Sequence, residues 1–571
     1  MADTSFWAET DGADETFGYD EAYTWDDAED ASLFISSWTE YEGVISGLSD
    51  APTASFIMGN RIYFIEGANF VYYDGAESGP VTEIAYIPTV SLGKKPDGTG
   101  GTPNEVFNRI SQFWKESFDP DGTETEFHCD IIYQTDGVTP VTLSDNLFKA
   151  YLYEEELIED TDFTFDRETW VATFDAAPGY VNDVDTLQIQ LEATDLMDTT
   201  VIAGCTIAIE HGGKNNSVVL LTGNPAYPNT VYYSWVYNPT YWPEDYDFNV
   251  GGDALPVTGL GRMNEYLISY KKPGDQSLQW YSEIDVDTDG DIFYNTYQLN
   301  DQYGCIAPRT VHPAQNGLLA LSDQGVIWTW PELLQGHYNS KIVSRNINGK
   351  NGIAEGLLDN TVADLEGAFA VIHNNKYMLH VGDKVWILDL DYSDLGQNIF
   401  CWYPYAGLYE NASAFLNKEG RLYVGDEATG LIYMSQLATD DTYHNDDGVA
   451  IDAWWKCPLL FLGGRDWEKK FERLNLSFKA SYGTTHSLTF YSDAGSEVIS
   501  LRQEAGRFDA RYFHAEYFNA GSFAPDFPTA QSEKIGIKGE YFSFMIRNNM
   551  LDRGMTLLAA VVTYLPRKRI K

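Results

Sequence analysis

The sequence predicts an all-β fold: a β-propeller of about six blades that carries an inserted β-sandwich domain and ends in a C-terminal β-domain. Three observations lead to this prediction. The composition favours strands, a strand–turn–strand pattern recurs at intervals of roughly 50 residues, and two long stretches depart from that pattern.

The composition is typical of many short strands joined by tight turns. Phe, Trp and Tyr make up 15% of the 571 residues, and the chain has 49 glycines and 22 prolines. Aromatic residues are enriched in strands, whereas Gly and Pro are enriched in turns. The chain is also too long for a single hydrophobic core, so we expect several domains.

Residues 1–50 are acidic and aromatic and have no clear periodicity. Trp7, Trp25, Phe34 and Trp38 favour burial. We therefore expect an acidic N-terminal arm that orders against a partner or against the protein's own surface.

The repeat begins at Phe56, where an apolar run is followed by a Gly or Asn turn and a Tyr- or Trp-rich strand. Equivalent positions in later copies are separated by 48, 52, 58 and 45 residues; these positions are Val219, Leu267, Leu319, Tyr377 and Leu422. Four-stranded propeller blades recur at roughly 40–50 residues. One hairpin cannot bury its apolar face alone, but radially stacked copies can. Residues 51–103 are therefore predicted to form the first propeller segment and residues 205–447 the remaining blades.

Two stretches have a different texture. Residues 104–204 alternate short strands with Asp, Pro and Gly, and they are long enough to form a β-sandwich inserted into a blade loop, where insertions are tolerated. After residue 447 the repeat stops. The alternating segments SLTFYSD, EYFSFMIRNN and TLLAAVVTYL predict a C-terminal β-domain over residues 448–571.

The charge balance excludes some classes of partner. The chain has 86 acidic and 36 basic residues, a formal net charge of -50. Tight nucleic-acid binding needs Lys and Arg to displace counterions from phosphates, so we expect neither a DNA-gripping protein nor an anchor on an anionic membrane. A like-charged surface that DNA slides past remains compatible with this balance.

The five cysteines are far apart and odd in number, which favours core thiols in a protein made in a reducing compartment. We find no basic-apolar signal segment and no apolar run long enough for a membrane-spanning helix. The sequence therefore predicts a soluble protein.

The chain carries no catalytic signature that we can identify. It lacks the G-x-S-x-G elbow, the H-E-x-x-H zinc motif and the phosphate loop. A glycosidase would need two carboxylates at one sugar bond, and no pair stands out among so many acidic residues. We expect a protein that is not an enzyme and that requires no cofactor.

One local pattern has chemical content, the D-x-D-x-D-G-D run of Asp285, Asp287, Asp289, Gly290 and Asp291. Alternate carboxylates converge on a hard cation, and the glycine permits a sharp turn. The Glu that would complete an EF-hand loop is replaced by Thr296. The pattern is compatible with a structural calcium site and also with an acidic, solvent-facing hairpin loop.

Three stretches of the repeat resemble the propeller-bearing tail nozzle or hub proteins of short-tailed bacteriophages, known as tail tubular protein B or packaged-DNA stabilisation protein. They are RIYFIEGANFVYYDG with AYIPTV, LTGNPAYPNTVYYSWVYNPTYWPEDYDFNVGG, and YGCIAPRTVHPAQNGLLALSDQGVIW, and the resemblance covers roughly residues 50–435.

The resemblance implies a structural virion protein. Such a protein forms a ring, commonly a hexamer, that caps the connector and contacts portal, adaptor and other tail proteins. The packaged DNA passes through without specific binding. The implied location is the virion tail, after assembly in the host cytoplasm, and the family offers no catalytic residues.

Two alternatives remain open. A receptor-binding tail adhesin would recognise host glycan through exposed aromatic residues, for which the candidates are Tyr232, Tyr233, Trp235, Tyr241 and Trp242. Blade packing is the competing explanation for the same residues. The second alternative is a propeller glycosidase.

Overall fold

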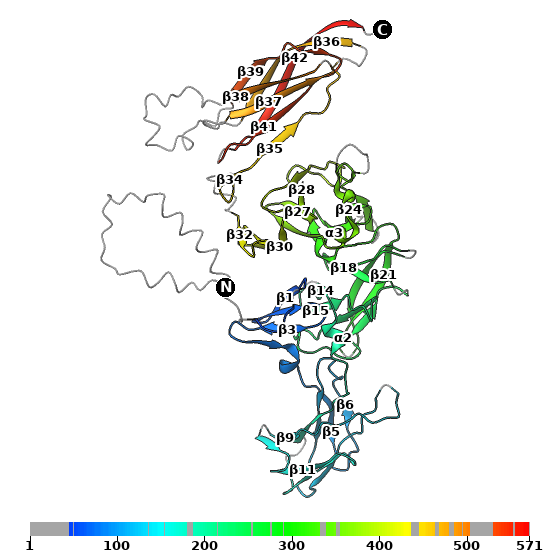
Figure 1. The fold of residues 1–571 in the computed structure, drawn as a ribbon. Coiled ribbons are helices and arrows are strands. Elements are labelled where there is room, and N and C mark those ends of the chain that lie inside the picture. The colour runs from blue at the N-terminus through cyan, green and yellow to red at the C-terminus, as the bar shows by residue number, and fades with distance from the viewer. Residues whose placement is uncertain are drawn as a thin grey trace, which may run out of the picture. The chain divides into compact units, whose positions relative to one another are not determined.

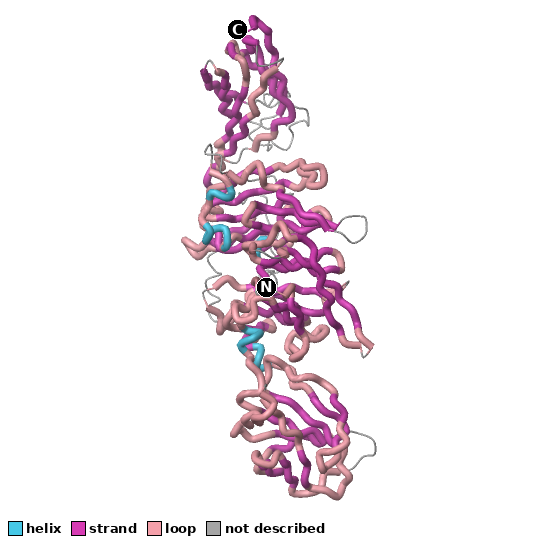
Figure 2. The backbone as a smooth tube through the Cα atoms, turned by 90° about the vertical axis from the view of Figure 1, so that its right-hand side faces the viewer, coloured by secondary structure: helices cyan, strands magenta, loops and turns pink. Residues whose placement is uncertain are grey.

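The structure is a computed structural model, and almost every element in it is a β-strand (Figures 1 and 2). The α-helices among the described residues are α2 (Thr200–Ala203) and α3 (Val362–Glu366). The all-β prediction is confirmed. The described residues are 45–49, 51–134, 136–153, 155–179, 187–213, 215–252, 255–274, 277–288, 290–331, 338–349, 355–435, 445–462, 467–478, 485–493, 495–502, 529–551 and 554–569.

Six antiparallel sheets follow the predicted repeat, each with its strands side by side in chain order. Sheet one is β1 (Ala54–Met58), β2 (Arg61–Ile65), β3 (Phe70–Tyr73) and β4 (Ser78–Pro80); sheet two is β14 (Ile207–His211), β15 (Val218–Thr222), β16 (Thr230–Tyr233) and β17 (Asp247–Asn249). Sheet three is β18 (Val257–Met263), β19 (Tyr266–Lys271), β20 (Gln279–Val286) and β21 (Ile292–Asn300); sheet four is β22 (His312–Ala314), β23 (Gly317–Ser322), β24 (Gly325–Pro331) and β25 (Tyr338–Ile342). Sheet five is β26 (Phe369–His373), β27 (Lys376–Val381), β28 (Lys384–Asp389) and β29 (Trp402–Tyr405), and sheet six is β30 (Ala412–Lys418), β31 (Arg421–Asp426) and β32 (Ile432–Met434).

The predicted register of the repeat agrees with these sheets. Val219, Leu267, Leu319, Tyr377 and Leu422 each lie on the second strand of their sheet, and all five are buried. The hairpin turn at Asn374 and Asn375 has positive φ at both residues, 47° and 55°. Such a turn matches the twist of the flanking strands, and Asn tolerates this conformation.

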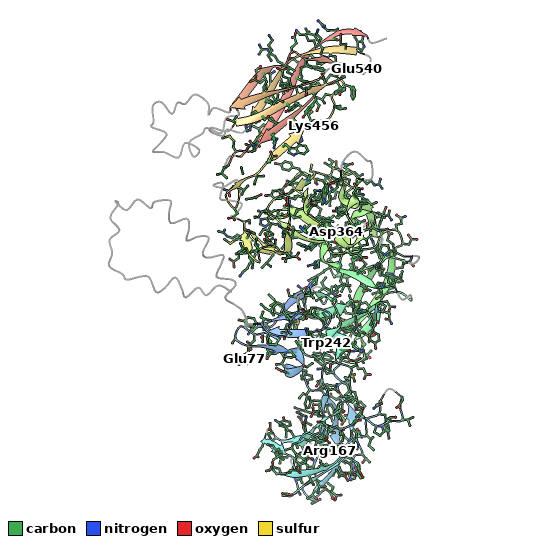
Figure 3. All side chains as sticks on the ribbon, in the orientation of Figure 1. Glu77, Arg167, Trp242, Asp364, Lys456 and Glu540 are labelled. Carbon is green, nitrogen blue, oxygen red and sulfur yellow. The ribbon has the colours of Figure 1, made fainter. Side chains whose placement is uncertain are left out.

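The first five sheets bury their faces against each other in chain order. Sheets one and two share a core that includes Trp242, which is labelled in Figure 3. The rings of Phe70 and Trp242 lie edge to face, with their centroids 6.2 Å apart. Separate clusters join sheets two and three, sheets three and four, and sheets four and five. The first strands also adjoin in order, β1 to β14, β14 to β18, β18 to β22 and β22 to β26. Neighbour stacking therefore supplies the burial that one hairpin lacks.

The stretch between sheets one and two forms two sheets around one core. The six-stranded sheet has the order β10-β9-β13-β7-β5-β6 and the three-stranded sheet the order β11-β12-β8. Their bounds are β5 (Thr89–Lys94), β6 (Thr102–Pro103), β7 (Phe113–Phe118), β8 (Glu126–His128), β9 (Lys149–Leu152), β10 (Glu155–Ile158), β11 (Phe163–Asp166), β12 (Val171–Phe174) and β13 (Leu187–Glu192). We call residues 89–192 the inserted module.

The inserted module starts before residue 104, the boundary expected from the sequence, because β5 and β6 belong to its larger sheet. β5 pairs in parallel with β7. Parallel neighbours need a crossover connection, so this pairing leaves no local turn signal in the sequence. Trp114, Phe127 and Phe163 are buried between the two sheets.

Residues 445–569 include a second sandwich, with sheets β35-β41-β37-β38 and β39-β36-β40 and with β42 paired to β36. Both sheets contribute to one core, which includes Phe471 and Phe490. The strands are β33 (Asn445–Asp446), β34 (Val449–Ala450), β35 (Ala453–Lys456), β36 (Trp467–Phe478), β37 (Thr485–Ser492), β38 (Gly495–Arg502), β39 (Thr529–Lys534), β40 (Lys538–Gly539), β41 (Ser543–Asn548) and β42 (Leu557–Arg569).

Three other sequence predictions concern the N-terminal arm, the cysteines and membrane-spanning segments. Residues 1–44 and 50 of the expected N-terminal arm lie outside the described residues. Cys129, Cys205, Cys305 and Cys457 are buried free thiols as predicted, whereas Cys401 is half-buried and its thiol donates to the Tyr392 carbonyl. No helix within the described ranges is long and apolar enough to cross a membrane.

Candidate functional site

The predicted calcium loop is the tip of the β20–β21 hairpin. Asp287 and Asp291 hold the turn closed: the Asp291 amide donates to Asp287 Oδ1 at 2.9 Å, and the Asp287 amide donates to the Asp291 carbonyl at 2.9 Å. Asp285 Oδ1 accepts from the Val286 amide at 2.9 Å, and Asp289 lies outside the described residues. Within the described part of the chain, no group of three or more His, Cys, Asp or Glu residues is arranged to hold a metal ion.

A structural calcium at this loop stays a prediction with a direct test. Titration of calcium into the full-length protein is expected to release or absorb heat, and Asp287→Ala is expected to remove that signal because it deletes a central carboxylate. The matched control is Asp383→Ala, which removes an exposed carboxylate elsewhere. Titration of the unaltered protein without any heat of binding would end the calcium hypothesis.

The five aromatic residues that motivated a glycan-binding surface are mostly core residues. Tyr232, Tyr233, Tyr241 and Trp242 are at most 3% exposed, and only Trp235, at 37%, reaches solvent. Tyr232 and Trp242 belong to the core shared by sheets one and two, and Tyr233 belongs to the core shared by sheets two and three. The Tyr233 ring stacks on Tyr246, and the Trp235 and Tyr241 rings contact each other. The alternation of aromatic residues is therefore explained by sheet packing, and the exposed platform assumed for the adhesin is absent at four of the five positions.

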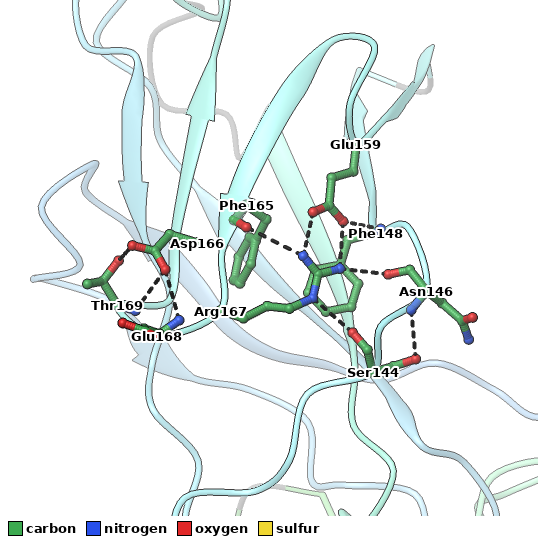
Figure 4. Close-up of polar contacts among 9 residues, drawn as sticks. All are labelled: Ser144, Asn146, Phe148, Glu159, Phe165, Asp166, Arg167, Glu168 and Thr169. Atoms are coloured by element: carbon green, nitrogen blue, oxygen red, sulfur yellow. Dashed lines mark hydrogen bonds and ion pairs between the residues drawn. The ribbon is translucent and has the colours of Figure 1, made fainter.

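Charged residues of the inserted module hold loops and strands together. The Arg167 guanidinium binds both carboxylate oxygens of Glu159, at 2.6 and 3.0 Å, and also donates to the Ser144 and Asn146 carbonyls at 2.9 and 2.8 Å (Figure 4). It lies 4.5 Å from the centroid of the Phe148 ring. Such a fork-like ion pair orients a loop without leaving a group free for chemistry.

A cleft of about 530 Å³ on the inserted module is lined by carboxylates, the feature that a glycosidase would need. Asp97 Oδ1 accepts from the hydroxyl and the amide of Thr99, and these bonds lower the pKa of Asp97. Backbone amides of Glu124 and Thr123 and the Thr123 hydroxyl likewise lower the pKa of Asp121. A general acid needs a raised pKa, so these two residues are turn-forming groups that do not suit the acid role.

One exposed apolar feature is the outer face of β42. Leu558, Val561 and Leu565 are 54%, 57% and 52% exposed, while Val562 and Tyr564 pack against the core of the second sandwich. Among the described strands β42 pairs with β36 alone, so no other described strand pairs with its second edge. We call Leu558, Val561 and Leu565 the β42 outer face.

A second exposed apolar feature lies on β35, the edge strand of the other sheet of this sandwich. Trp454 and Trp455 are 61% and 48% exposed. Large aromatic side chains on an edge strand are typical of interfaces between proteins. Both sheets of the second sandwich therefore present an apolar edge strand to solvent.

The sequence predicted the strand β42 but not its exposed face. The run TLLAAVVTYL is apolar at both odd and even positions, a pattern typical of a strand that is buried on both faces. The structure buries one face only. Sequence reasoning identified the strand but not the exposed surface, because exposure depends on which sheets pack over it.

Comparisons with known proteins do not place the chain in a family. No family model matches it, and no curated protein matches it. Among solved structures, it is similar to an exo-β-1,3-galactanase from Phanerochaete chrysosporium (8% identity, 61% of this chain and 78% of that chain, TM-score 0.17) and to the dihydro-heme d1 dehydrogenase NirN (9% identity, 73% of each chain, TM-score 0.23). A Bombyx mori β-fructofuranosidase matches at 9% identity, over 62% of this chain and 77% of that chain, with a TM-score of 0.14. These TM-scores are too low to transfer an activity.

Proposed function

We propose that this chain is a structural, non-enzymatic subunit of a bacteriophage tail. In this proposal it forms a ring, commonly a hexamer, as a nozzle or hub around the DNA exit channel, and it retains and gates the packaged genome. The six consecutive sheets are proposed to be blades of one closed propeller. Portal, adaptor and other tail proteins are the proposed partners, and the virion tail is the proposed location.

The observation that carries the assembly part of the proposal is the β42 outer face. The first nine residues of β42, before Pro566 and the basic residues at its end, expose Leu and Val side chains on an edge that no described strand covers. Such an edge is a template for contact with another chain, and soluble proteins usually cover or charge it. A ring uses the same contact repeatedly between neighbouring copies. Residues 50–435 resemble phage tail proteins, and the charged and aromatic residues described above serve packing. Both points support a mechanical role over a catalytic one.

The acidic charge supports a channel whose wall does not bind DNA. With a net charge of -50, the chain offers few cations for phosphate contacts. Repulsion between the duplex and an acidic wall would let DNA leave without being caught. Affinity within the ring would then come from the β-domains, which make protein contacts and do not need to touch the genome.

The assembly is tested by replacing Val561 with glutamate. In the proposed ring, the new glutamate carboxylate would lose its water at a subunit contact. Val561→Glu is therefore expected to convert oligomers into monomers, as measured by sedimentation velocity at micromolar concentration. Val362→Glu is the matched control, since Val362 is 70% exposed and lies on α3 in another part of the chain. Val362→Glu is expected to leave the assembly unchanged.

Two outcomes would contradict the proposal. An unaltered chain that is monomeric at all concentrations, and that does not join purified portal and adaptor rings, would remove the ring. Hydrolysis of host polysaccharide by the purified chain would favour the glycosidase instead. Labelling the chain in an image of the virion gives the independent check of location.

A further inference from the structure

A polar pocket of about 400 Å³ lies between sheets one and two, away from the β42 outer face. The β1–β2 turn, the end of β3 and the loop that joins β16 to β17 form its walls. Its polar and aromatic lining includes Asn60, Arg61, Asp74, Tyr237 and Asn238. Both sheets belong to the same compact unit and share one core, so the pocket is built on a packed base.

Asp74 supplies a fixed acceptor. Its Oδ1 accepts from the amides of Glu77 and Ala76 at 2.8 and 2.9 Å, and these bonds lower the pKa of the Asp74 carboxyl. The carboxylate is therefore oriented and charged. No described residue donates to Oδ2, which leaves that oxygen available to a ligand.

Arg61 and Asn238 supply donors. The Arg61 guanidinium lies 5.6 Å from the centroid of the Tyr72 ring, and its charge acts on the Asp74 carboxyl and on the Tyr63 hydroxyl, which line the same pocket. Asn238 Oδ1 accepts from the hydroxyl and the amide of Thr240 at 2.7 and 3.2 Å, which directs the amide nitrogen elsewhere. A planar guanidinium and an amide in fixed orientations suit a ligand with several hydroxyl groups.

Tyr237 supplies an exposed aromatic surface. The residue is 62% exposed and has a φ of 55°, in the left-handed region that bulky side chains adopt at an energetic cost. Its amide donates to the Ser217 carbonyl at 2.6 Å, which holds the backbone in this conformation. An aromatic ring that the backbone presents to solvent beside polar groups is available for stacking against an apolar ring face.

We infer that this pocket binds a neutral saccharide through one pyranose ring. Hydroxyl groups both donate and accept, so a sugar can satisfy Asp74 as well as Arg61 and Asn238, while its C–H face stacks on Tyr237. The opposite charges of Arg61 and Asp74 offset each other, and the acidic chain disfavours polyanions. The pocket volume falls within the range of small-ligand sites. This inference is independent of the ring assembly.

The test uses the full chain and the methyl glycosides of glucose, galactose, mannose and rhamnose, monitored by saturation-transfer NMR and calorimetry. At least one glycoside is expected to bind saturably. Tyr237→Ala is expected to weaken that binding at least tenfold, and Asp74→Asn is expected to weaken it severalfold. Tyr237→Phe keeps the ring and is expected to bind as the unaltered protein does.

The control is Tyr392→Ala, which removes a 76% exposed tyrosine that does not line the pocket. It is expected to leave binding unchanged, and equal thermal melting of all variants separates a local effect from misfolding. The inference is overturned if none of the four glycosides binds saturably at millimolar concentration. It is equally overturned if Tyr237→Ala and Tyr392→Ala bind alike.

Discussion

Lys94→Met is expected to destabilise the inserted module by about 3–5 kcal/mol, the range found when one partner of a buried ion pair is removed. Lys94 and Glu116 are 1% and 0% exposed, and their charged groups lie 2.5 Å apart between β5 and β7. Without the ammonium, the buried Glu116 carboxylate keeps the Asp130 amide as a donor but loses its counter-charge, so it stays charged without a cation or takes up a proton. Either outcome costs free energy.

The pKa shifts of the pair indicate how strongly the two groups depend on each other. Burial alone would lower the pKa of Lys94, but the carboxylates of Glu116 and Asp130 outweigh it, so the pKa is raised. Burial raises the pKa of Glu116, and the neighbouring ammonium only partly offsets that effect. Loss of Lys94 would therefore raise the pKa of Glu116 further.

Two controls isolate the buried pair. Asp130→Asn removes a carboxylate that lies 3.0 Å from the same ammonium but is 56% exposed, so a loss below about 1 kcal/mol is expected. The double variant Lys94→Met with Glu116→Leu is expected to recover much of the stability, because apolar groups of similar size replace buried pairs well. Native-state hydrogen exchange of β7 and β13 measures the opening free energy. Equal losses for Lys94→Met and Asp130→Asn would contradict the prediction.

The parts of the fold that the sequence predicted are governed by local interactions. The alternation around Leu319 and Tyr377 and the Asn374–Asn375 turn each involve residues a few positions apart, so the second strands of the sheets could be identified. The start of the inserted module could not, since it depends on the parallel pairing of β5 with β7 across an intervening connection. Local patterns carry no information about such a partner.

The candidate sites were harder to predict than the fold for a related reason. Composition suggests that charged residues are exposed, so nothing marked Lys94 and Glu116 as a buried pair. The burial of Tyr232 and Trp242 depends on the neighbouring sheet, which the local sequence does not specify. Asp74 and Tyr237 line one pocket although they are 163 positions apart in the chain, and only the packing of sheet one on sheet two brings them together.

Acid is expected to weaken the contact between sheets two and three through His211. This imidazole is fully buried, and its Nδ1 lies 2.9 Å from the Tyr294 hydroxyl. Burial, and to a smaller extent the nearby Arg262, lower the pKa of His211 to about 4. Because the folded pKa lies below the ordinary value of 6.5, protons bind preferentially to the unfolded chain. The stability from neutral His211 is fully present above pH 6.5 and is lost as the pH falls toward 4.

The size of this effect follows from the shift. Each pH unit between about 6.5 and 4 costs up to ~1.4 kcal/mol, so roughly 3 kcal/mol is expected to be lost at pH 4. His211→Gln retains a polar partner for Tyr294 but cannot take up the proton. It is therefore expected to flatten the pH dependence of hydrogen exchange in β14 and β21. The matched control is His128→Gln, which removes an exposed imidazole and is expected to leave that pH dependence unchanged.

The pH window separates His211 from the carboxylates that also titrate in acid. Hydrogen bonds lower the pKa of Asp97 and Asp121 in the inserted module, so their contribution to stability is lost at more acidic pH than that of His211. A fall in protection of β14 between pH 6.5 and 5 that persists in His211→Gln would assign the effect to another group, such as His312, whose pKa is also lowered by burial. A fall that disappears in His211→Gln, with no change in the inserted module, assigns it to this one imidazole.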